Sequence, residues 1–412
     1  MLVEYSALIL WTLTAITIVL LAPGSIYVIA LSTFGAIIAA SLLIAWAAEA
    51  SESSISRGLA LAIVAIVQTI PEYFVEGTIA WKAGKEPEPG IWTHNVIANF
   101  TGANRLLTGF GWPLILLTLI IQRRRNGQQG ATTIALRREQ SVEVVFMLGA
   151  SLYYVWVLIQ AELTIFDAIV WVGIFVAYMW MLARLPRGKE STEEPPLGPS
   201  RAIVEIKSTR KKTAAILGLF LFAGLTFVLI TDSFVTTIQK LAEMFLLGLL
   251  GSGAVFFTIQ WIAPVLSEFP EKVTAFNWAR QITLAPLALL NFISSSVNEL
   301  TALVALIPVV YFVSSRGAGS IPLGQLQWIE IFLTMSQSLY ACASLLDLKY
   351  DIQNALVLLV LWAISTAVIE ARLLVAILFL VFAAWETLRS RGHIVVLSAF
   401  RETLRKGVFR RT

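Results

Sequence analysis

Long apolar runs recur along the chain and constrain its fold more than any other feature. Each run covers about 17 to 28 residues, close to the length that an α-helix needs to cross the hydrocarbon core of a bilayer. Hydrophobic residues make up 58% of the 412 residues and charged residues only 14%. Such a chain lacks the polar surface that a soluble domain needs. We therefore predict an all-α integral membrane protein.

Gly, Pro and polar residues between these runs separate about 12 predicted transmembrane helices. The segment from Asp232 to Leu249 is ambiguous, because it fits either a surface helix or the start of the next span. The N-terminal run has no basic region before it and is long for a signal peptide, so we expect a retained helix. The predicted spans are residues 5–22, 26–48, 57–83, 94–121, 141–160, 164–185, 213–231, 250–278, 284–312, 326–346, 353–370 and 373–389.

The distribution of Lys and Arg predicts the orientation of these spans. With twelve spans, most basic loop residues fall on one side of the membrane, which identifies that side as cytoplasmic. This predicts a multi-pass protein of the cell inner (plasma) membrane with both termini in the cytoplasm. The net charge of +4 then follows from topology, so we expect membrane lipid and no nucleic acid as a partner. The opposite side receives only Lys82, Lys85, Lys240, Arg316 and Arg372.

Two distant stretches of the chain resemble each other. Residues 140–160 align without gaps to residues 327–347, which matches Glu143 with Glu330. Each half of the chain contains five predicted spans. Because five is odd, the second half enters the membrane from the opposite side, so its copy is inverted relative to the first. The predicted units are an N-terminal extra helix (1–25), the first repeat (26–185), a cytoplasmic linker (186–212), the second repeat (213–372), and a last extra helix with a basic cytoplasmic tail (373–412).

Each predicted repeat carries a Pro-Glu pair inside an apolar span, at Glu72 and at Glu271. A carboxylate at bilayer depth costs about 2.5 to 3.5 kcal/mol on insertion scales, and a proline there frees backbone carbonyls. The neighbours Glu271 and Lys272 also fit an interfacial ion pair. Two pairs in matching positions favour one ion site at the midplane between the repeats, with Glu72 and Glu271 as its metal-binding carboxylates.

A polar stretch follows each Pro-Glu helix and supplies neutral oxygen atoms. Carboxylate, amide and hydroxyl oxygens are the ligands of hard cations such as Na⁺ and Ca²⁺. Facing carboxylates also compete for H⁺. The candidate neutral ligands are Thr69, Ser267, Asn99, Asn104, Ser295 and Asn298.

The two halves resemble the α-repeats of the sodium/calcium exchanger family, within the cation/Ca²⁺ antiporters, over roughly residues 26–372. In that family the strings G-T-S-x-P-E and G-N-x-x-G-S-N form the ion sites. The resemblance places Gln68 and Thr69 at the Thr and Ser of the first string, and Ser267 and Glu268 at the same places in the second repeat. It places Asn99 and Ser295 at the serine of the other string, with Asn104, Asn298 and Glu299 as competing candidates beyond it.

The sequence departs from the family pattern at several positions, which indicates a divergent member. Val67 and Leu266 replace the first glycine of the Pro-Glu strings, and Glu268 adds a third carboxylate. Arg105 brings a modulating positive charge into the polar helix, where we expect it to hold a cation position or to pair with Glu72, Glu76 or Glu268.

These features predict a secondary active cation antiporter that exchanges Na⁺ or H⁺ for Ca²⁺ or another metal cation by alternating access. The alternative is a non-transporting cation sensor or scaffold that keeps the exchanger fold while Arg105 blocks the site. The sequence has no HExxH, CxxC or clustered Asp pair, so we expect no enzyme and no covalently bound cofactor. Glu143 and Glu330 are interpreted as acids that favour helix N-termini.

Overall fold

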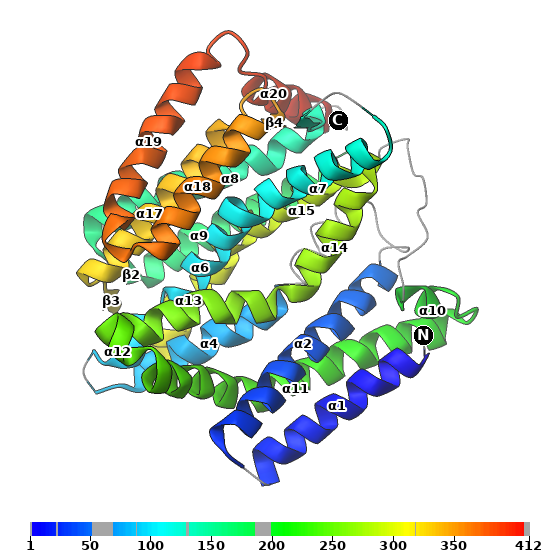
Figure 1. The fold of residues 1–412 in the computed structure, drawn as a ribbon, viewed down its shortest axis with the longest axis vertical. Helices are drawn as coiled ribbons and strands as arrows, with labels where there is room; N and C mark the ends of the chain where they lie inside the picture. Colours follow the sequence, from blue (N-terminus) through cyan, green and yellow to red (C-terminus); the bar gives the residue numbers. More distant parts are fainter. Residues whose placement is uncertain are drawn as a thin grey trace.

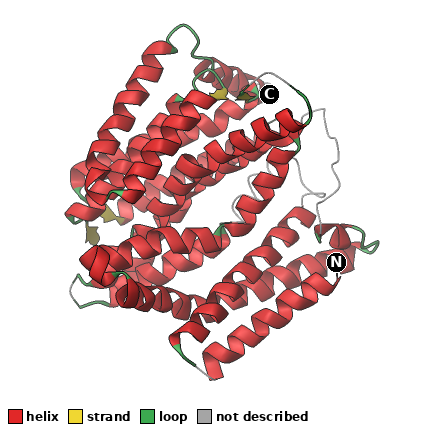
Figure 2. Cartoon of the chain, viewed as in Figure 1, coloured by secondary structure: helices red, strands yellow, loops and turns green. Residues whose placement is uncertain are grey.

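The computed structural model is almost entirely helical, with four short strands among its described residues (Figures 1 and 2). It describes residues 2–21, 24–51, 69–87, 89–128, 132–185, 199–317 and 319–407. Within these residues, eight helical stretches are long and apolar enough to cross a membrane, and two further apolar helices are shorter. Large apolar side chains such as Leu221 and Ile159 point outward, as expected for a lipid-facing surface. The predicted all-α membrane fold is confirmed.

The N-terminal part of the chain, residues 2–185, begins with a mostly exposed helix, α1, and a largely buried one, α2. The Pro-Glu helix is α4, and the next span is a stack of α5, α6, a π-helical turn η2, and α7. The elements are α1 (Leu2–Leu21), α2 (Ile26–Ser51), α4 (Ile70–Lys85), α5 (Ile91–Asn95), α6 (Ala98–Leu106), η2 (Leu107–Gly111), α7 (Trp112–Arg125), β1 (Thr133–Ala135), η3 (Arg138–Gln140), α8 (Ser141–Gln160), β2 (Glu162–Thr164) and α9 (Ile165–Arg184).

The C-terminal part, residues 199–407, shares with the N-terminal part the order of a span with a π turn, a short strand, a long helix, a short strand and a further helix, and it ends with α19 and α20. The elements are α10 (Ser200–Val204), α11 (Thr209–Phe245), α12 (Leu247–Leu250), η4 (Gly251–Gly253), α13 (Ala254–Ser267), α14 (Phe269–Arg280), η5 (Ile282–Leu284), α15 (Ala285–Asn298), η6 (Glu299–Leu303), α16 (Val304–Ser314), β3 (Ser320–Pro322), α17 (Gln325–Ala343), β4 (Lys349–Asp351), α18 (Ile352–Ala367), η7 (Ile369–Ala371), α19 (Arg372–Arg389) and α20 (Val396–Gly407).

Two predicted spans differ in detail from the helices observed. The ambiguous segment that begins at Asp232 continues α11 without a break as far as Phe245, so α11 is 37 residues long. The predicted span 250–278 is divided at Glu268 into α13 and α14. Pro270 lies in the first turn of α14, where a proline fits a helix start because its missing N–H needs no partner there. Of the predicted span 57–83, residues 57–68 lie outside the described part.

The two parts of the chain share a π-helical turn at corresponding places. η2 and η6 each cover five residues, and each lies in the span that follows a Pro-Glu helix. A π turn contains an extra residue and weakens the regular hydrogen-bond ladder of the helix. Side chains from other helices donate hydrogen bonds to carbonyls at these turns. Gln337 Nε2 donates to the carbonyl of Arg105, just before η2, at 2.9 Å, and the Tyr154 hydroxyl donates to the carbonyl of Leu300, within η6, at 3.2 Å.

Two short antiparallel ribbons join the N-terminal part to the C-terminal part. β1 pairs with β4, with Ile134 opposite Tyr350, and β2 pairs with β3, with Leu163 opposite Ile321. In Figure 1 the label β4 lies near one end of the bundle, and β2 and β3 lie near the other. β1 and β3 precede α8 and α17, whereas β2 and β4 follow them. This crosswise pairing is what two inverted copies of one unit produce, and it supports the proposed repeat.

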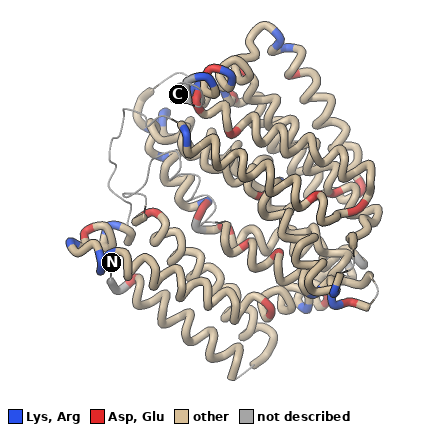
Figure 3. The backbone as a smooth tube through the Cα atoms, turned by 180° about the vertical axis from the view of Figure 1, so that it is seen from behind, with Lys and Arg blue, Asp and Glu red and all other residues tan. Residues whose placement is uncertain are grey.

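Charged residues are unevenly distributed along the bundle. Figure 3 shows Lys and Arg mainly near the ends of helices, while acidic positions also occur along their middle. The segment predicted as a basic tail contains α20, which packs beside α8. Glu402 of α20 pairs there with Arg138 at 3.0 Å. The buried charged side chains, which include Glu72 and Arg105, are the ones whose cost inside the membrane needs explanation.

A close helix contact at Gly102 predicts a large effect of a small substitution. The Cβ of an alanine there would lie 1.8 Å from the carbonyl oxygen of Gln260, so α6 and α13 would have to separate. We expect Gly102→Ala to destabilise the protein by about 1 to 3 kcal/mol, as overpacking does, and to lower the thermal unfolding temperature in detergent. Gly149→Ala is the control, because a Cβ at Gly149 meets nothing within 4 Å. Equal unfolding temperatures for the two variants would contradict the contact.

Candidate cation site

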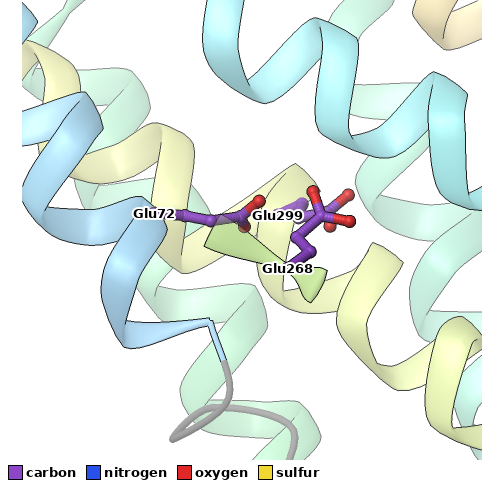
Figure 4. Close-up of side chains that lie close together, drawn as sticks. All are labelled: Glu72, Glu268 and Glu299. Atoms are coloured by element: carbon purple, nitrogen blue, oxygen red, sulfur yellow. The ribbon is translucent and has the colours of Figure 1, made fainter. Parts of the chain in front are cut away.

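Three glutamate side chains meet in the interior of the helical bundle (Figure 4). One carboxylate oxygen from each of Glu72, Glu268 and Glu299 lies within 4.8 Å of the other two. All three residues have zero solvent exposure. Glu72 belongs to the N-terminal part of the chain, and the other two belong to the C-terminal part. These three residues are the glutamate cluster.

Two helix starts and one π turn position the three side chains. Glu72 lies in the first turn of α4, and Glu268 is the residue that caps α14. Both therefore lie at the N-terminal end of a helix, where the helix dipole favours negative charge. Glu299 is the first residue of the π turn η6, and the extra residue of that turn changes the direction of the side chains around it.

The carboxylates of the cluster lack the partners that buried charge normally has. Among the described residues, neither oxygen of Glu72 or Glu299 has a hydrogen-bond partner, and neither does Oε1 of Glu268. Burying an ionised carboxylate without compensation is very costly, and like charges close together increase that cost. The cluster therefore needs positive charge, which metal ions or protons can supply.

Neutral polar groups surround the cluster and connect the two parts of the chain. Asn298 donates from Nδ2 to Thr69 Oγ1 at 2.5 Å and accepts from the Tyr73 hydroxyl at 2.6 Å. Asn104 lies beside Glu299, and its Oδ1 accepts from Ser338 Oγ at 2.8 Å. Of the predicted ligands, Asn104 thus lies against the cluster, and Thr69 and Asn298, which are close in sequence to Glu72 and Glu299, bond to each other between the two parts of the chain.

Glu271 lies next to the cluster but outside its three-way contact. Its Oε1 accepts from Ser295 Oγ at 2.5 Å and from Asn291 Nδ2 at 3.1 Å, whereas Oε2 has no partner in the described part of the chain. The structure therefore groups Glu72 with Glu268 and Glu299 and places Glu271 beside them. Ser267 directs its hydroxyl to the carbonyl of Ala263 in its own helix, at 2.8 Å.

The remaining predicted ligands lie around Glu76 or outside the described residues. Glu76 follows Glu72 by one helical turn, is fully buried, and lies beside Asn99. The ligand set predicted from the sequence includes Asn99 but not Glu76. The spacing of four residues from Glu72 is the signal for it, since such residues share a helix face. Gln68 lies outside the residues that the structure describes.

A lysine also contacts the cluster. The ammonium of Lys272 pairs with Oε2 of Glu268, four residues before it in the chain. The sequence suggested an ion pair between the neighbours Glu271 and Lys272, but residues one apart point in different directions on a helix. The partner of Lys272 is therefore Glu268.

Arg105 does not enter the cluster, contrary to the expected pairing with Glu72, Glu76 or Glu268. Its Nη2 lies 2.7 Å from Oε2 of Glu330, and all atoms of both side chains are buried. Consecutive residues on a helix point about 100° apart, so Asn104 faces Glu299 while Arg105 points toward α17.

Glu330 also pairs with Arg372 and accepts a hydrogen bond from Gln260 Nε2 at 2.7 Å. Arg105, Glu330 and Arg372 are the arginine-glutamate triad. The interpretation of Glu330 as a helix-start acid is therefore wrong, because its carboxylate is the counter-ion of two buried arginines. Matching it with Glu143 concealed this, because the aligned stretches, residues 140–160 and 327–347, contain neither arginine.

Comparisons with known proteins agree with this architecture. Residues 24–184 match the model of the family described as sodium/calcium exchanger protein. A crystal structure of the H⁺/Ca²⁺ exchanger CAX is 30% identical, with a TM-score of 0.85, over 98% of this chain and 97% of that chain. A structure of the sodium-calcium exchanger NCX_Mj, soaked with Na⁺ and Sr²⁺, is 14% identical with a TM-score of 0.53 over 89% of this chain and 99% of that chain. A search of curated proteins gave no match.

The likeness to NCX_Mj establishes the shared fold alone. The likeness to CAX extends over nearly the full length of both chains and includes sequence identity. The family match covers the stretch that contains the first Pro-Glu pair. The chain therefore belongs to the sodium/calcium exchanger family of cation/Ca²⁺ exchangers.

Proposed function

We propose that the protein is a secondary active cation antiporter in which the glutamate cluster binds the transported ion. The observation that carries this proposal is the meeting of three buried carboxylates with unpartnered oxygens, contributed by both parts of the chain. Oxygen-only sites suit Ca²⁺. The relative called H⁺/Ca²⁺ exchanger, at 30% identity, favours H⁺ over Na⁺ as the coupling ion.

Exchange would follow from competition for the same oxygens. Protons and a divalent ion each neutralise the cluster, so binding of one favours release of the other. Thr69, Asn104 and Asn298 would supply or orient neutral ligands, and Glu271, with Ser295, would add a carboxylate at the edge. Ser267, Asn99 and Gln68 remain further candidates.

Alternating access at the midplane of an inverted repeat would expose the cluster to each side in turn. The crosswise β-ribbons and the matched π turns support that plan. The proposed setting remains the inner (plasma) membrane, with both termini in the cytoplasm and the unit limits predicted above.

A flux assay in proteoliposomes tests the proposal. With the membrane potential clamped, an imposed H⁺ gradient should drive Ca²⁺ in the opposite direction, and an imposed Na⁺ gradient of equal size should drive much less. Protein-free liposomes measure the leak. Antiport is contradicted if neither gradient moves Ca²⁺, Mg²⁺, Na⁺ or K⁺.

The same preparation separates an antiporter from a sensor or scaffold. A cation that binds the folded state must stabilise it. A Ca²⁺-dependent rise in unfolding temperature without any flux would support the sensor. The specific reason for favouring that alternative was a blocking Arg105, and Arg105 pairs with Glu330 instead.

A further inference from the structure

Lys272 is the feature of the cluster that the proposed function leaves unused. It lies in α14, one turn after Glu268, and its ammonium pairs with Oε2 of that carboxylate. The Glu268 side chain is fully buried, whereas 13% of the Lys272 side chain is exposed. One oxygen of Glu268 is thus occupied by the lysine, and the other, Oε1, has no partner among the described residues.

The charge of Lys272 acts on the whole group of acids. Its ammonium is close enough to interact electrostatically with Glu72, Glu271 and Glu299 as well. The other buried cation near this region, Arg105, is held by Glu330. Within the described part of the chain, Lys272 is therefore the cationic side chain that pairs with the glutamate cluster.

We infer that Lys272 is a tethered internal cation that competes with the transported ion for Glu268, an inference that rests on the proposed function. With all three carboxylates of the cluster ionised, the lysine leaves two uncompensated negative charges, and a divalent ion that takes the place of the lysine leaves one. Binding of the ion draws Glu268 Oε2 into the coordination sphere and displaces the ammonium. A lysine suits this role, because its flexible stem lets the ammonium move toward water and its point charge forms no fixed bidentate fork.

The competition has two consequences for transport. It weakens binding of the divalent ion, so that the ion can leave the site, and the returning ammonium keeps Glu268 compensated afterwards. It also favours divalent over monovalent ions, because a monovalent ion that displaces the ammonium only restores the charge of the lysine, whereas a divalent ion compensates one more carboxylate.

Ca²⁺ titration of the purified protein tests the inference, by calorimetry and by thermal shift. Lys272→Met removes the charge and keeps the length of the side chain. At an effective dielectric constant near 20, the repulsion between the ammonium of Lys272 and a divalent ion a few ångströms away is large enough to change the Kd for Ca²⁺ by about tenfold or more. We expect Lys272→Met to bind Ca²⁺ about tenfold more tightly, to release it more slowly in the flux assay, and to become sensitive to Na⁺.

Two control variants identify the cause of any change. Lys272→Arg keeps the charge and should bind Ca²⁺ no more tightly than the wild type. Lys82→Met removes a lysine that pairs with Asp232 at 2.7 Å, away from the cluster, and should leave the Kd for Ca²⁺ unchanged. If Lys272→Met does not fold, Lys272→Arg still decides, since tighter binding with the charge retained overturns the inference.

The outcomes distinguish this inference from the proposed function. If the wild type transports Ca²⁺ and Lys272→Met has the same Kd for Ca²⁺ as the wild type, the proposed role of Lys272 is overturned and the proposed antiport is not. Binding of Ca²⁺ by Lys272→Met but not by the wild type would support the lysine and contradict transport. Absence of binding in both proteins would overturn both.

Discussion

Replacement of Glu72 by Gln should lower Ca²⁺ flux by about 100-fold or more while leaving the folded protein at least as stable. Loss of one of three ligand charges removes a few kcal/mol of attraction for a divalent ion, and each 1.4 kcal/mol is a factor of ten. A neutral amide is also less costly to bury than an unpartnered carboxylate. Flux of each variant, normalised to reconstituted protein, and thermal unfolding in detergent without Ca²⁺ measure the two effects.

Glu143→Gln is the matched control, because Glu143 is also buried, with 4% exposure, but lies in α8 outside the cluster. It should transport Ca²⁺ close to the wild-type rate. The combination of high stability and lost flux in Glu72→Gln separates loss of a ligand from misfolding. Ca²⁺ flux at the wild-type rate in Glu72→Gln would show that Glu72 is not a ligand and would contradict the proposed ion site.

Neutralising Glu330 should have the largest effect on stability. Glu330→Gln leaves Arg105 and Arg372 buried without their shared counter-ion, and breaking a buried pair in this way costs about 3 to 5 kcal/mol. Both arginines retain minor contacts, such as the hydrogen bond from Arg372 Nε to the carbonyl of Ser365 at 3.0 Å, but no second carboxylate pairs with them among the described residues. A markedly lower unfolding temperature, with or without Ca²⁺, is the expected result.

The triple replacement of Arg105, Glu330 and Arg372 by Met distinguishes a role in stability from one in ion binding. Buried ion pairs replaced as a set by apolar residues of similar size are often neutral or stabilising. We expect the triple variant to recover most of the stability lost in Glu330→Gln and to retain Ca²⁺ binding. If Glu330→Gln unfolds at the wild-type temperature, the triad does not stabilise the fold.

Hydropathy was sufficient to predict the membrane fold and most helix positions, because helices in lipid must satisfy their own backbone and are long and apolar. The cost of acids in hydrocarbon drew attention to Glu72 and Glu271, and the family resemblance added Glu268 and Glu299. The composition of the cluster needed three-dimensional information. Which acids meet depends on the break at Glu268 and on the π turn at Glu299, and neither leaves a reliable mark on apolar periodicity.

The position of Arg105 shows a second limit of prediction from the sequence. Its neighbour Asn104 faces the cluster. In the sequence the two residues belong to the same polar stretch, which predicts both of them near the ion site. Rotation around the helix separates them, and the partner of Arg105 is supplied by α17, far away in the chain. Symmetry between the repeats was misleading at this point, because it assigned to Glu330 the same role as to Glu143.

The bonds that cross between the two parts of the chain also bear on how the protein is made. In each of these bonds one partner lies in the N-terminal part and the other in the C-terminal part. The pairs are β1 with β4, Thr69 with Asn298, Asn104 with Ser338, and the carbonyl of Arg105 with Gln337. A ribosome delivers the partners of the N-terminal part only after the C-terminal part has been synthesised. During that interval, early helices hold polar groups in lipid without their final partners, which is the situation that membrane chaperones and quality-control proteases recognise. We therefore expect the interior of the bundle to close only after both parts of the chain have been inserted.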